Sequence, residues 1–335
     1  MLSTMTIRSF EPDDLPAFGD LFAACFGYRR PEAFEAWRVL KTPIGVTPGM
    51  VAMDGGRLVA CATIWPTCLM LGKERVKAGI LMDLMSHPDY RGKGHFVRIV
   101  TALQDRLALS GFDVLYAFPN DNSYPVLVHR LNWDHTGDVP IWRRPIAVLR
   151  DKPPPVPQAA KALIKIASRR SSTRGWRISE DMLTPRDLAD IERRGDGDRS
   201  AECRIARDET WFAWRYAPES GMGYRHLVAS DSSGAQACII WREAHRRAFV
   251  TEALGSPAGL ASAIAALVAK AERSGLAVIE ASTSDPTAIE ALRANGFWRR
   301  SHHRFAVRAL TARTLARNIH DHASWRLFGG DCDWM

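Results

Sequence analysis

Two glycines and two basic side chains meet in the stretch Arg91-Gly92-Lys93-Gly94. An apolar segment, 80–85, precedes the stretch, and apolar side chains recur at helical spacing after it, at Phe96, Ile99, Val100, Leu103 and Leu107. A strand that turns into a helix at this corner would present the first free backbone N–H groups of the helix, which attract anions. Glycine allows positive φ angles and close approach of a ligand to the backbone. These residue types and their spacing predict a binding site for a diphosphate.

Asp83 is the first candidate for proton transfer, because it interrupts the apolar run 80–85. Burial would raise the pKa of its carboxyl group toward the range in which a general base works. The alternative is a buried aspartate that is hydrogen-bonded to a neighbouring loop and has a structural role. The sequence around Asp83 leaves both interpretations open.

The elements expected to position these residues occur twice in the sequence. Ala36-Trp37-Arg38 recurs as Ala213-Trp214-Arg215, a shift of 177 residues, and Gly111 matches Gly275 with a shift of 164. A shift that only shortens along the chain indicates a duplication followed by loop deletions. Glu252 then stands at the place of Asp83, five residues before Pro257 as Asp83 is before Pro88. An acid that recurs in both copies favours the structural role for Asp83.

Each half predicts the same order of strands and helices, from period-2 and period-3.6 patterns and from a Gly-Gly turn. The expected segments are a hairpin over 50–65, strands over 80–85 and 113–118, and helices over 34–40, 96–110 and 124–133, followed in the second half by a helix over 260–268, a strand over 276–281 and a helix over 288–297. We expect the α+β class, with two tandem domains that each contain a mixed, mostly antiparallel sheet flanked by helices.

A basic, proline-rich segment separates the two copies. Four prolines fall within residues 153–157, which favours an extended start, and a short amphipathic helix follows from the pattern of the later residues. Between residues 150 and 177 there are eight Lys or Arg and one Asp, so this segment holds nearly all of the net charge of +8. We expect domains at 1–150 and 176–310, a linker at 151–175, and a C-terminal helix and tail at 311–335.

The loop resembles the acyl-CoA diphosphate loop of the GCN5-related N-acetyltransferases (GNAT), Arg/Gln-x-x-Gly-x-Gly/Ala. The preceding strand, Pro88, Arg91 and Gly94 match the family pattern, whereas Phe96 stands where the family has a final Gly or Ala. A bulky residue there is similar to the Eis-type branch of tandem acetyltransferases. The resemblance covers the first half well, and the second half only through the order of elements and the closing 288–297 segment.

The resemblance implies that an acyl group, most simply acetyl from acetyl-CoA, passes directly to the primary amine of a small polar acceptor. It implies a backbone N–H in the strand before the loop that stabilises the oxyanion. The family's usual acid is a tyrosine, and its position is Val128 here, so Tyr124 or His129 is expected to act as the acid instead. Asp83 remains the candidate base. A thiolate that leaves without a protein donor is the alternative. The residues expected to contact CoA are Leu84, Met85, Ser86, Arg91, Gly92, Lys93, Gly94, His95, Phe96 and Asn122.

The second copy is expected to lack this chemistry. Five residues are missing before its helix, and "SPAGL" replaces the basic corner. A structural role follows from that loss, closing the acceptor pocket or forming a dimer surface. The tail ends in "GGDCDWM", and the resemblance to Eis-type enzymes raises the possibility that Asp331, Asp333 or Met335 reaches the acceptor pocket, with a frayed terminus as the alternative.

Composition narrows the class of protein. An apolar fraction of 46% with 24% charged residues is typical of a soluble globular protein. The six cysteines are scattered without metal-ligand spacing, His320 and His322 diverge on a helix, and we expect no metal and a cytoplasmic protein. A homodimer is compatible with the sequence, and no nucleic-acid partner and no membrane span are expected. Two alternative functions remain. The chain could be a CoA-binding regulatory or interaction module without turnover, or it could bind nucleic acid or membrane surfaces through the basic linker.

Overall fold

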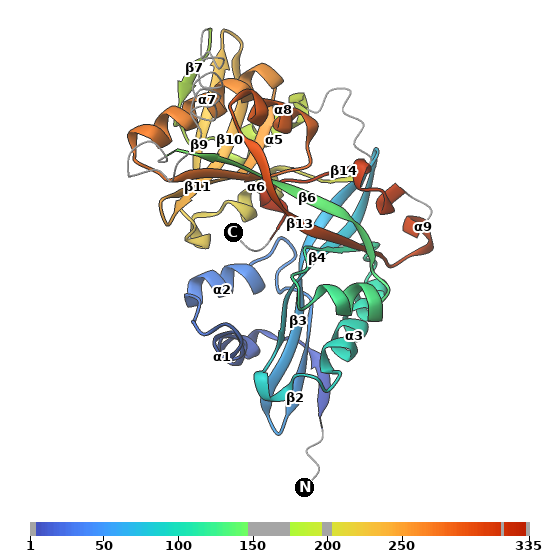
Figure 1. Cartoon of the computed structure of the whole chain (residues 1–335). Coiled ribbons are helices and arrows are strands. Elements are labelled where there is room, and N and C mark those ends of the chain that lie inside the picture. The colour runs from blue at the N-terminus through green and yellow to red at the C-terminus, as the bar shows by residue number, and fades with distance from the viewer. Residues whose placement is uncertain (1–4, 147–174, 196–202, 316–317, 333–335) are drawn as a thin grey trace.

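Neighbouring side chains along a strand of the first half point to opposite faces of the sheet and pack against different helices. The computed structural model describes residues 5–146, 175–195, 203–315 and 318–332. Within it, Val51 packs on α1 (Leu15–Phe26), whereas its neighbours Met50 and Ala52 pack on α3 (His95–Leu109). One sheet is therefore covered by helices on both faces, as Figure 1 shows for α1 and α2 on one side and α3 on the other.

The first half follows the predicted order of elements. Its elements are β1 (Thr6–Ser9), η1 (Pro12–Asp14), α1, α2 (Glu32–Val39), β2 (Gly49–Asp54), β3 (Arg57–Leu71), β4 (Glu74–Ser86), η2 (Pro88–Tyr90), α3, β5 (Val114–Ala117), the π-helical turn η3 (Val126–Arg130) and β6 (Asp134–Pro145). The predicted hairpin, strands and helices are confirmed. The last predicted helix is shorter than expected and contains a π-helical turn.

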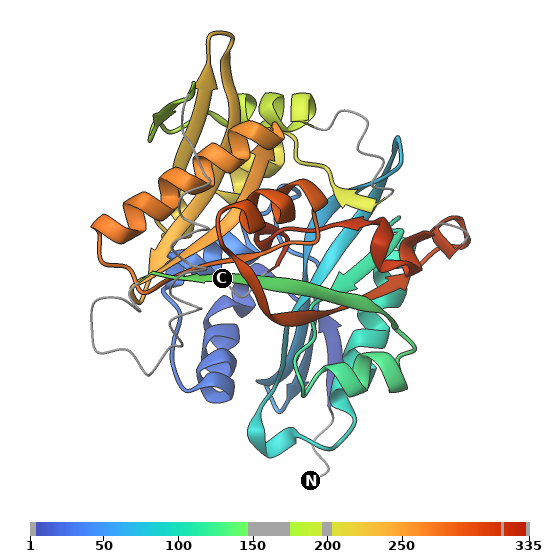
Figure 2. The ribbon, with the colours of Figure 1, turned by 45° about the horizontal axis from the view of Figure 1, so that its top comes forward.

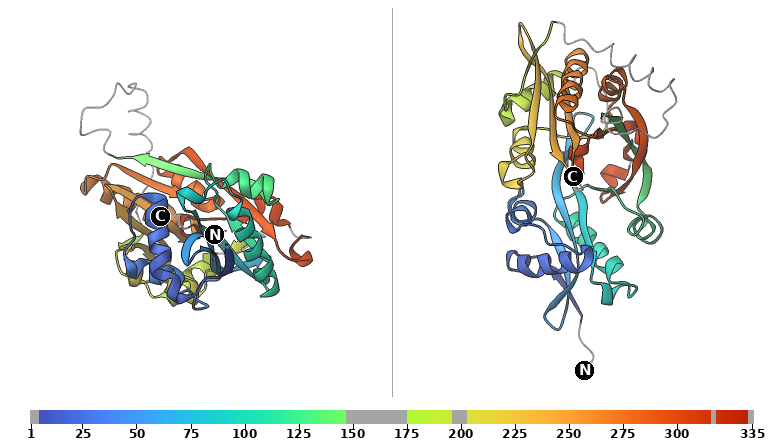
Figure 3. Two further views of the ribbon diagram at one scale, coloured as in Figure 1. Left: turned by 90° about the horizontal axis from the view of Figure 1, so that it is seen from below. Right: turned by 60° about the vertical axis from the view of Figure 1, so that its left-hand side comes forward.

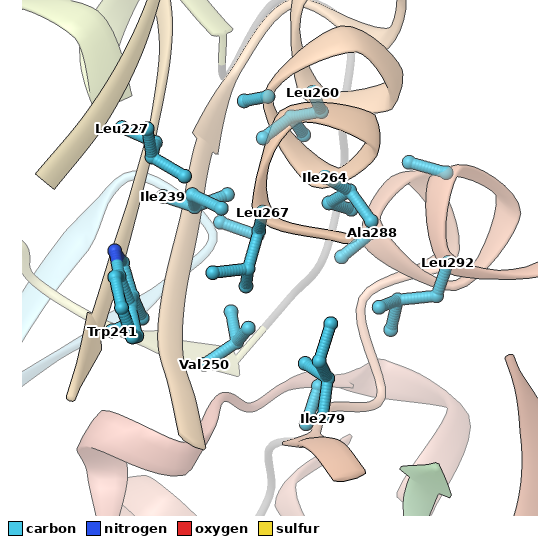
Figure 4. Packing of buried hydrophobic residues seen from close by; sticks show 14 of the residues in the cluster. Leu227, Ile239, Trp241, Val250, Leu260, Ile264, Leu267, Ile279, Ala288 and Leu292 are labelled. Atoms are coloured by element: carbon cyan, nitrogen blue, oxygen red, sulfur yellow. The ribbon is translucent and has the colours of Figure 1, made fainter. Parts of the chain in front are cut away.

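The second half repeats this order. Its elements are β7 (Arg177–Ser179), α5 (Pro185–Gly195), β8 (Cys203–Ile205), α6 (Glu209–Arg215), η5 (Pro218–Ser220), β9 (Arg225–Asp231), β10 (Gly234–Ala244), β11 (Arg247–Gly255), α7 (Pro257–Arg273), β12 (Val278–Ser282), α8 (Pro286–Ala294) and β13 (Trp298–Ala309), followed by α9 (Ala312–Leu315), η6 (Asn318–His320), η7 (His322–Ser324), β14 (Trp325–Arg326) and η8 (Gly329–Asp331). Figure 4 shows its core, where Leu260, Ile264 and Leu267 of α7 pack on Ile239 and Val250 of the sheet.

The two halves exchange their closing strands. β13 of the second half pairs with β5 of the first, and β6 of the first half pairs with β12 of the second. The pairs correspond residue for residue, because Ala306 lies opposite Ala117 and Trp142 lies opposite Ala281. Figure 2 shows β6, in green, crossing toward the orange strands of the second half. The predicted α+β class with mostly antiparallel sheets is confirmed, but the two sheets are joined into one rather than separate.

The C-terminal segment is buried rather than frayed as far as Cys332. β14 pairs with β8, which in turn pairs with the end of β3. Trp325 contacts the rings of Tyr116 and Phe305 at centroid distances of 6.2 and 4.9 Å. The right-hand view of Figure 3 shows the halves stacked along the long axis of the molecule. The basic linker and the end of the tail, with Asp333 and Met335, lie outside the described residues.

No helix in the described part of the chain is long and apolar enough to cross a membrane. Six cysteines are present as free thiols, four of them buried.

Candidate active site

The site begins where β4 and β5 separate. The two strands pair in parallel only from Ala78 to Ile80 on β4, and β4 then continues alone to Ser86. The pairing of β4 with β3 shifts just beyond this point, between Met82 and Met85. Asp83, within this bulge, takes a φ of 48°, which residues other than glycine seldom adopt. This bulge bends β4 away from β5. A cleft of about 1690 Å³ opens between them.

The predicted diphosphate loop borders this cleft. Gly92 and Gly94 have φ angles of 77° and 78°, and an added Cβ would meet nothing within 4 Å, so glycine is needed there for its backbone angles. α3 starts directly after Gly94, and no side chain caps its first amides. Arg91 is exposed at the rim, and its Nε donates to the Ser86 carbonyl at 3.3 Å. The first amides of α3 are thus left without a side-chain cap beside an exposed arginine, a geometry that suits an anion.

Nearly all of the predicted CoA contacts line the cleft. They are Leu84, Met85, Ser86, Arg91, Gly92, Gly94, His95, Phe96 and Asn122. Lys93 is the exception, because its ammonium lies 4.9 Å from the Tyr90 ring and it does not line the cleft. Phe96, at the position where a small residue was expected, packs into the core beneath α3. Its bulk is therefore directed at the protein interior.

Tyr90 fixes the loop to the β2–β3 hairpin. Its hydroxyl donates to Asp54 Oδ2 at 2.6 Å, across the Gly55-Gly56 turn that connects the two strands. On the other wall, Asn120 Oδ1 accepts the backbone N–H groups of Asn122 and Ser123, both at 3.0 Å. The walls on both sides of the cleft are thus held in place without a ligand.

Asp83 is bound by two arginines beneath the cleft. Arg38 Nη2 donates to both carboxylate oxygens at 2.8 and 2.9 Å, and Arg30 Nη1 donates at 3.1 Å. Burial works to raise the pKa of Asp83, but Arg38 and Arg30 outweigh it and the pKa is lowered. The expectation of a raised pKa was therefore wrong, because the sequence did not show the two partners. An ionised, doubly paired carboxylate fits the structural alternative better than a strong base.

Glu35 completes this cluster from α2. Its Oε1 accepts from Arg30 Nη1 at 3.3 Å, and its Oε2 lies 4.0 Å from Arg38 Nε. Burial and, next, the charge of Asp83 raise the pKa of Glu35. Two arginines and two acids thus balance each other where the β4 bulge meets α2.

Tyr124 and His129 are not brought to the cleft wall. The Tyr124 ring packs between His135, His129 and the guanidinium of Arg304, and neither Tyr124 nor His129 lines the cleft. His129 is exposed to solvent. The structure therefore supplies no support for either as the acid.

Sequence reasoning missed a second set of wall residues. Arg30, Phe34 and Arg38 line the cleft from the α1–α2 region, and the second half adds the ranges 219–222 and 302–304. Arg38 lies inside the repeated Ala-Trp-Arg, and Arg30 matches Arg207 with the same shift of 177, so a signal was present in the sequence. The strand exchange, which brings residues 302–304 to the cleft, left no signal in the pattern.

The matching place in the second half is filled by the chain itself. β11 and β12 pair from Arg247 to Val250 and then separate, and Phe328 forms a β-bridge with Thr283 in the gap. Gly330 lies so close that an added Cβ would meet Glu252 Oε1 at 2.2 Å. The tail therefore occupies the opening between β11 and β12, whereas the corresponding opening between β4 and β5 is free.

The tail is bound by counterparts of the first-half arginines. Arg207 Nη2 donates to Asp331 Oδ1 at 2.6 Å and Arg207 Nε to Glu252 Oε2 at 2.9 Å, and Arg215 Nε donates to the Gly330 carbonyl at 3.0 Å. Burial raises the pKa of Glu252 to about 7, with Arg207 acting against that shift. Asp331 is committed to this network and does not line the first-half cleft, so its predicted place in the acceptor pocket was wrong.

The start of α7 also differs from that of α3. Ser256 caps the helix by accepting from the Gly259 N–H, at 3.3 Å. This corner therefore has a side-chain cap and no basic side chain, whereas the corner at Gly94 has no such cap and carries Arg91.

No group of three or more His, Cys, Asp or Glu side chains that could hold a metal ion is found in the part of the chain that the structure describes.

The comparisons with known proteins agree with this geometry. Residues 6–136 match the model of the acetyltransferase (GNAT) domain family. The first half of the chain therefore carries an acetyltransferase (GNAT) domain. No curated protein matches its sequence.

Solved structures with the same fold extend over both halves. A protein of unknown function from Enterococcus faecalis has a TM-score of 0.70 at 12% identity, over 92% of this chain and 73% of that one. A GCN5-related N-acetyltransferase from Anabaena variabilis has a TM-score of 0.64 at 12% identity, with the same coverage. The Eis1 protein of Mycobacterium abscessus has a TM-score of 0.58 at 15% identity, over 91% of this chain and 74% of that one. At such identities the likeness establishes the fold alone.

Proposed function

We propose that the chain transfers an acetyl group from acetyl-CoA to the primary amine of a small polar acceptor, by direct attack of the amine on the thioester. The observation that carries this proposal is the open corner at Gly94, where an uncapped helix and Arg91 border the gap between β4 and β5. We further propose one CoA site per chain, in the first of two tandem domains, since the second opening is filled by the tail.

The residues divide the work along the cleft. Backbone amides at the start of α3, together with Arg91, would bind the diphosphate of CoA. Asn122 would contact the pantetheine arm from the opposite wall. When bound, acetyl-CoA supplies an activated acyl group whose thiolate leaves as the new amide forms.

The β4 bulge would supply the electrostatic part of catalysis. Leu84, Met85 and Ser86 line the cleft, and a backbone N–H of this segment would stabilise negative charge on the thioester oxygen. Asp83, held by Arg38 and Arg30, would fix the bulge and act only as a positioning residue. The amine would enter in its neutral form and lose its proton to water, because Asp83 is too weak a base to take it.

A screen of amines with acetyl-CoA, read out by the thiol that is released, tests the proposed function. The double variant Arg91→Glu/Gly94→Glu should lose turnover with every acceptor, whereas Lys93→Glu, which changes a charge in the same loop but outside the cleft, should keep most of it. Equal turnover in the wild type and in the double variant would refute the loop assignment. Absence of thiol release with every amine, despite binding of CoA, would favour a non-catalytic CoA-binding module.

A further inference from the structure

The charges along the cleft differ at its two ends. Arg91 and Arg130 border the end next to α3, and neither makes an ion pair with a residue that the structure describes. Positive charge at this end suits the phosphates of CoA. The question is which charge remains at the other end, next to α2, where the acceptor would enter.

The other arginines that line the cleft already have acidic partners. Arg29 pairs with Asp20, Arg30 and Arg38 share Asp83 and Glu35, and Arg304 Nη1 lies 2.6 Å from Asp121 Oδ1. Beside Arg304 on β13, burial lowers the pKa of His303 to about 3, so His303 is uncharged at neutral pH. The paired arginines and His303 therefore leave little net positive charge on these walls of the cleft.

Glu219 is the carboxylate on this wall whose negative charge is not balanced by the other charged groups of the wall. It is exposed, it borders the cleft, and it forms no ion pair with any residue in the described ranges. Its backbone is fixed, because Ser220 N–H donates to the Ala217 carbonyl at 3.0 Å and Gly221 N–H to the Pro218 carbonyl at 2.9 Å. The turn packs on α2. A rigid, solvated carboxylate therefore faces the space left for the acceptor.

Two aromatic rings of the segment before α2 also line the cleft. Phe26 and Tyr28 are 53% and 60% exposed, which is unusual for rings of this size, and both line the cleft. Each ring packs on the buried ring of Phe22, at centroid distances of 4.6 and 5.2 Å. Exposed aromatic faces attract cations and apolar groups.

We propose that the acceptor carries a second positive charge besides the amine that is acetylated, and that Glu219 and the rings of Tyr28 and Phe26 receive this charge and the apolar chain that bears it. This inference rests on the proposed function and specifies the acceptor as a diamine or a longer cationic amine. The second half thus contributes to substrate choice through Glu219, although its own acyl-CoA opening is filled.

The test compares unbranched α,ω-diamines of four to ten carbons with monoamines of the same length. For at least one length, the wild type should acetylate the diamine with a kcat/KM about five- to tenfold above that of the monoamine. Glu219→Gln should bring this ratio close to one, mainly through KM, and Glu219→Lys should invert it. Tyr28→Ala should lower the ratio, and Tyr28→Phe should keep it.

Glu32→Gln is the matched control, since Glu32 is an exposed acid on α2 that does not line the cleft. It should keep the wild-type ratio. Binding of each diamine to the CoA complex, measured by calorimetry, gives a readout that does not require turnover. If no diamine is preferred or bound more tightly than its monoamine, or if Glu219→Gln leaves the preference unchanged, the inference is wrong. Failure of the proposed function is distinct, because it removes thiol release with all amines, monoamines included.

Discussion

The indole rings of Trp37 and Trp214 stack 5.4 Å apart at an angle of 22°, and each ring N–H points to the other residue's carbonyl, at 2.9 and 3.5 Å. The two residues occupy the same place in the two copies, 177 positions apart. This reciprocal contact joins the two halves close to the arginine clusters of both. The halves therefore depend on each other for stability.

Trp37→Ala and Trp214→Ala should each destabilise the whole chain by about 3–5 kcal/mol, because each removes a buried indole and leaves a cavity. The effects should be less than additive in the double variant, since both changes remove the same stack. Chemical denaturation measures both quantities. Strict additivity, or loss of only one half of the cooperative transition, would contradict the mutual dependence.

Asp83→Asn should cost about 3–5 kcal/mol of folding free energy, because Arg38 and Arg30 would lose their shared counter-charge. The lowered pKa of Asp83 also sets a sign for the pH dependence. The ionised group stabilises the fold above its unfolded pKa of about 3.8, and this contribution is lost as the pH falls through the lower folded value. Unfolding curves between pH 3 and 6 measure the loss, and a variant as stable as the wild type at pH 6 would contradict the prediction.

The pH profile of turnover should follow the acceptor. Because the pKa of Asp83 is lowered, Asp83 is not expected to give an inflection of kcat/KM between pH 5 and 8, and the rate should rise as the amine deprotonates. Amines of different basicity check this. An inflection at the same pH for all amines would indicate a protein base after all.

Tyr124→Phe and His129→Ala should each change kcat by less than about threefold, since neither side chain lines the cleft. A loss of about a hundredfold in either variant would restore it as the acid.

Gly330→Ala should destabilise the fold by about 1–3 kcal/mol, because the added methyl would meet Glu252 Oε1 at 2.2 Å and the Tyr216 hydroxyl at 2.4 Å. The affinity for CoA should stay the same, since the tail fills the second opening and not the first. Calorimetric titration of folded variant checks this, and weaker CoA binding at full folding would place the tail in the first cleft.

Local patterns predicted the strand, the glycine turn and the helix that form the corner at Gly94. Gly92 and Gly94, the apolar run of β4 and the helical face of α3 lie within about 30 consecutive residues, so propensity and periodicity describe them fully. The order of elements in the second half followed from the repeat. These parts depend on neighbours along the chain.

The parts that were missed depend on contacts between distant segments. The partners of Asp83 come from α2 and the loop before it, more than 40 residues away, and reversed the expected direction of its pKa shift. β6 and β13 are equivalent strands of the two copies. The exchanged and the unexchanged arrangements therefore require the same alternation of apolar and polar side chains, and the sequence pattern could not distinguish them. The π-helical turn at Val126–Arg130 was also missed, because the apolar spacing there did not distinguish it from an α-helix.

The central claim is that the open corner at Gly94 binds the diphosphate of CoA. Calorimetric titration of the full chain with CoA tests it most directly, with Arg91→Glu/Gly94→Glu and the Lys93→Glu control measured beside the wild type. We expect one CoA per chain, at least about tenfold weaker binding in the double variant and nearly unchanged binding in the control. Equal affinity in all three proteins, or two CoA molecules per chain, would contradict the account.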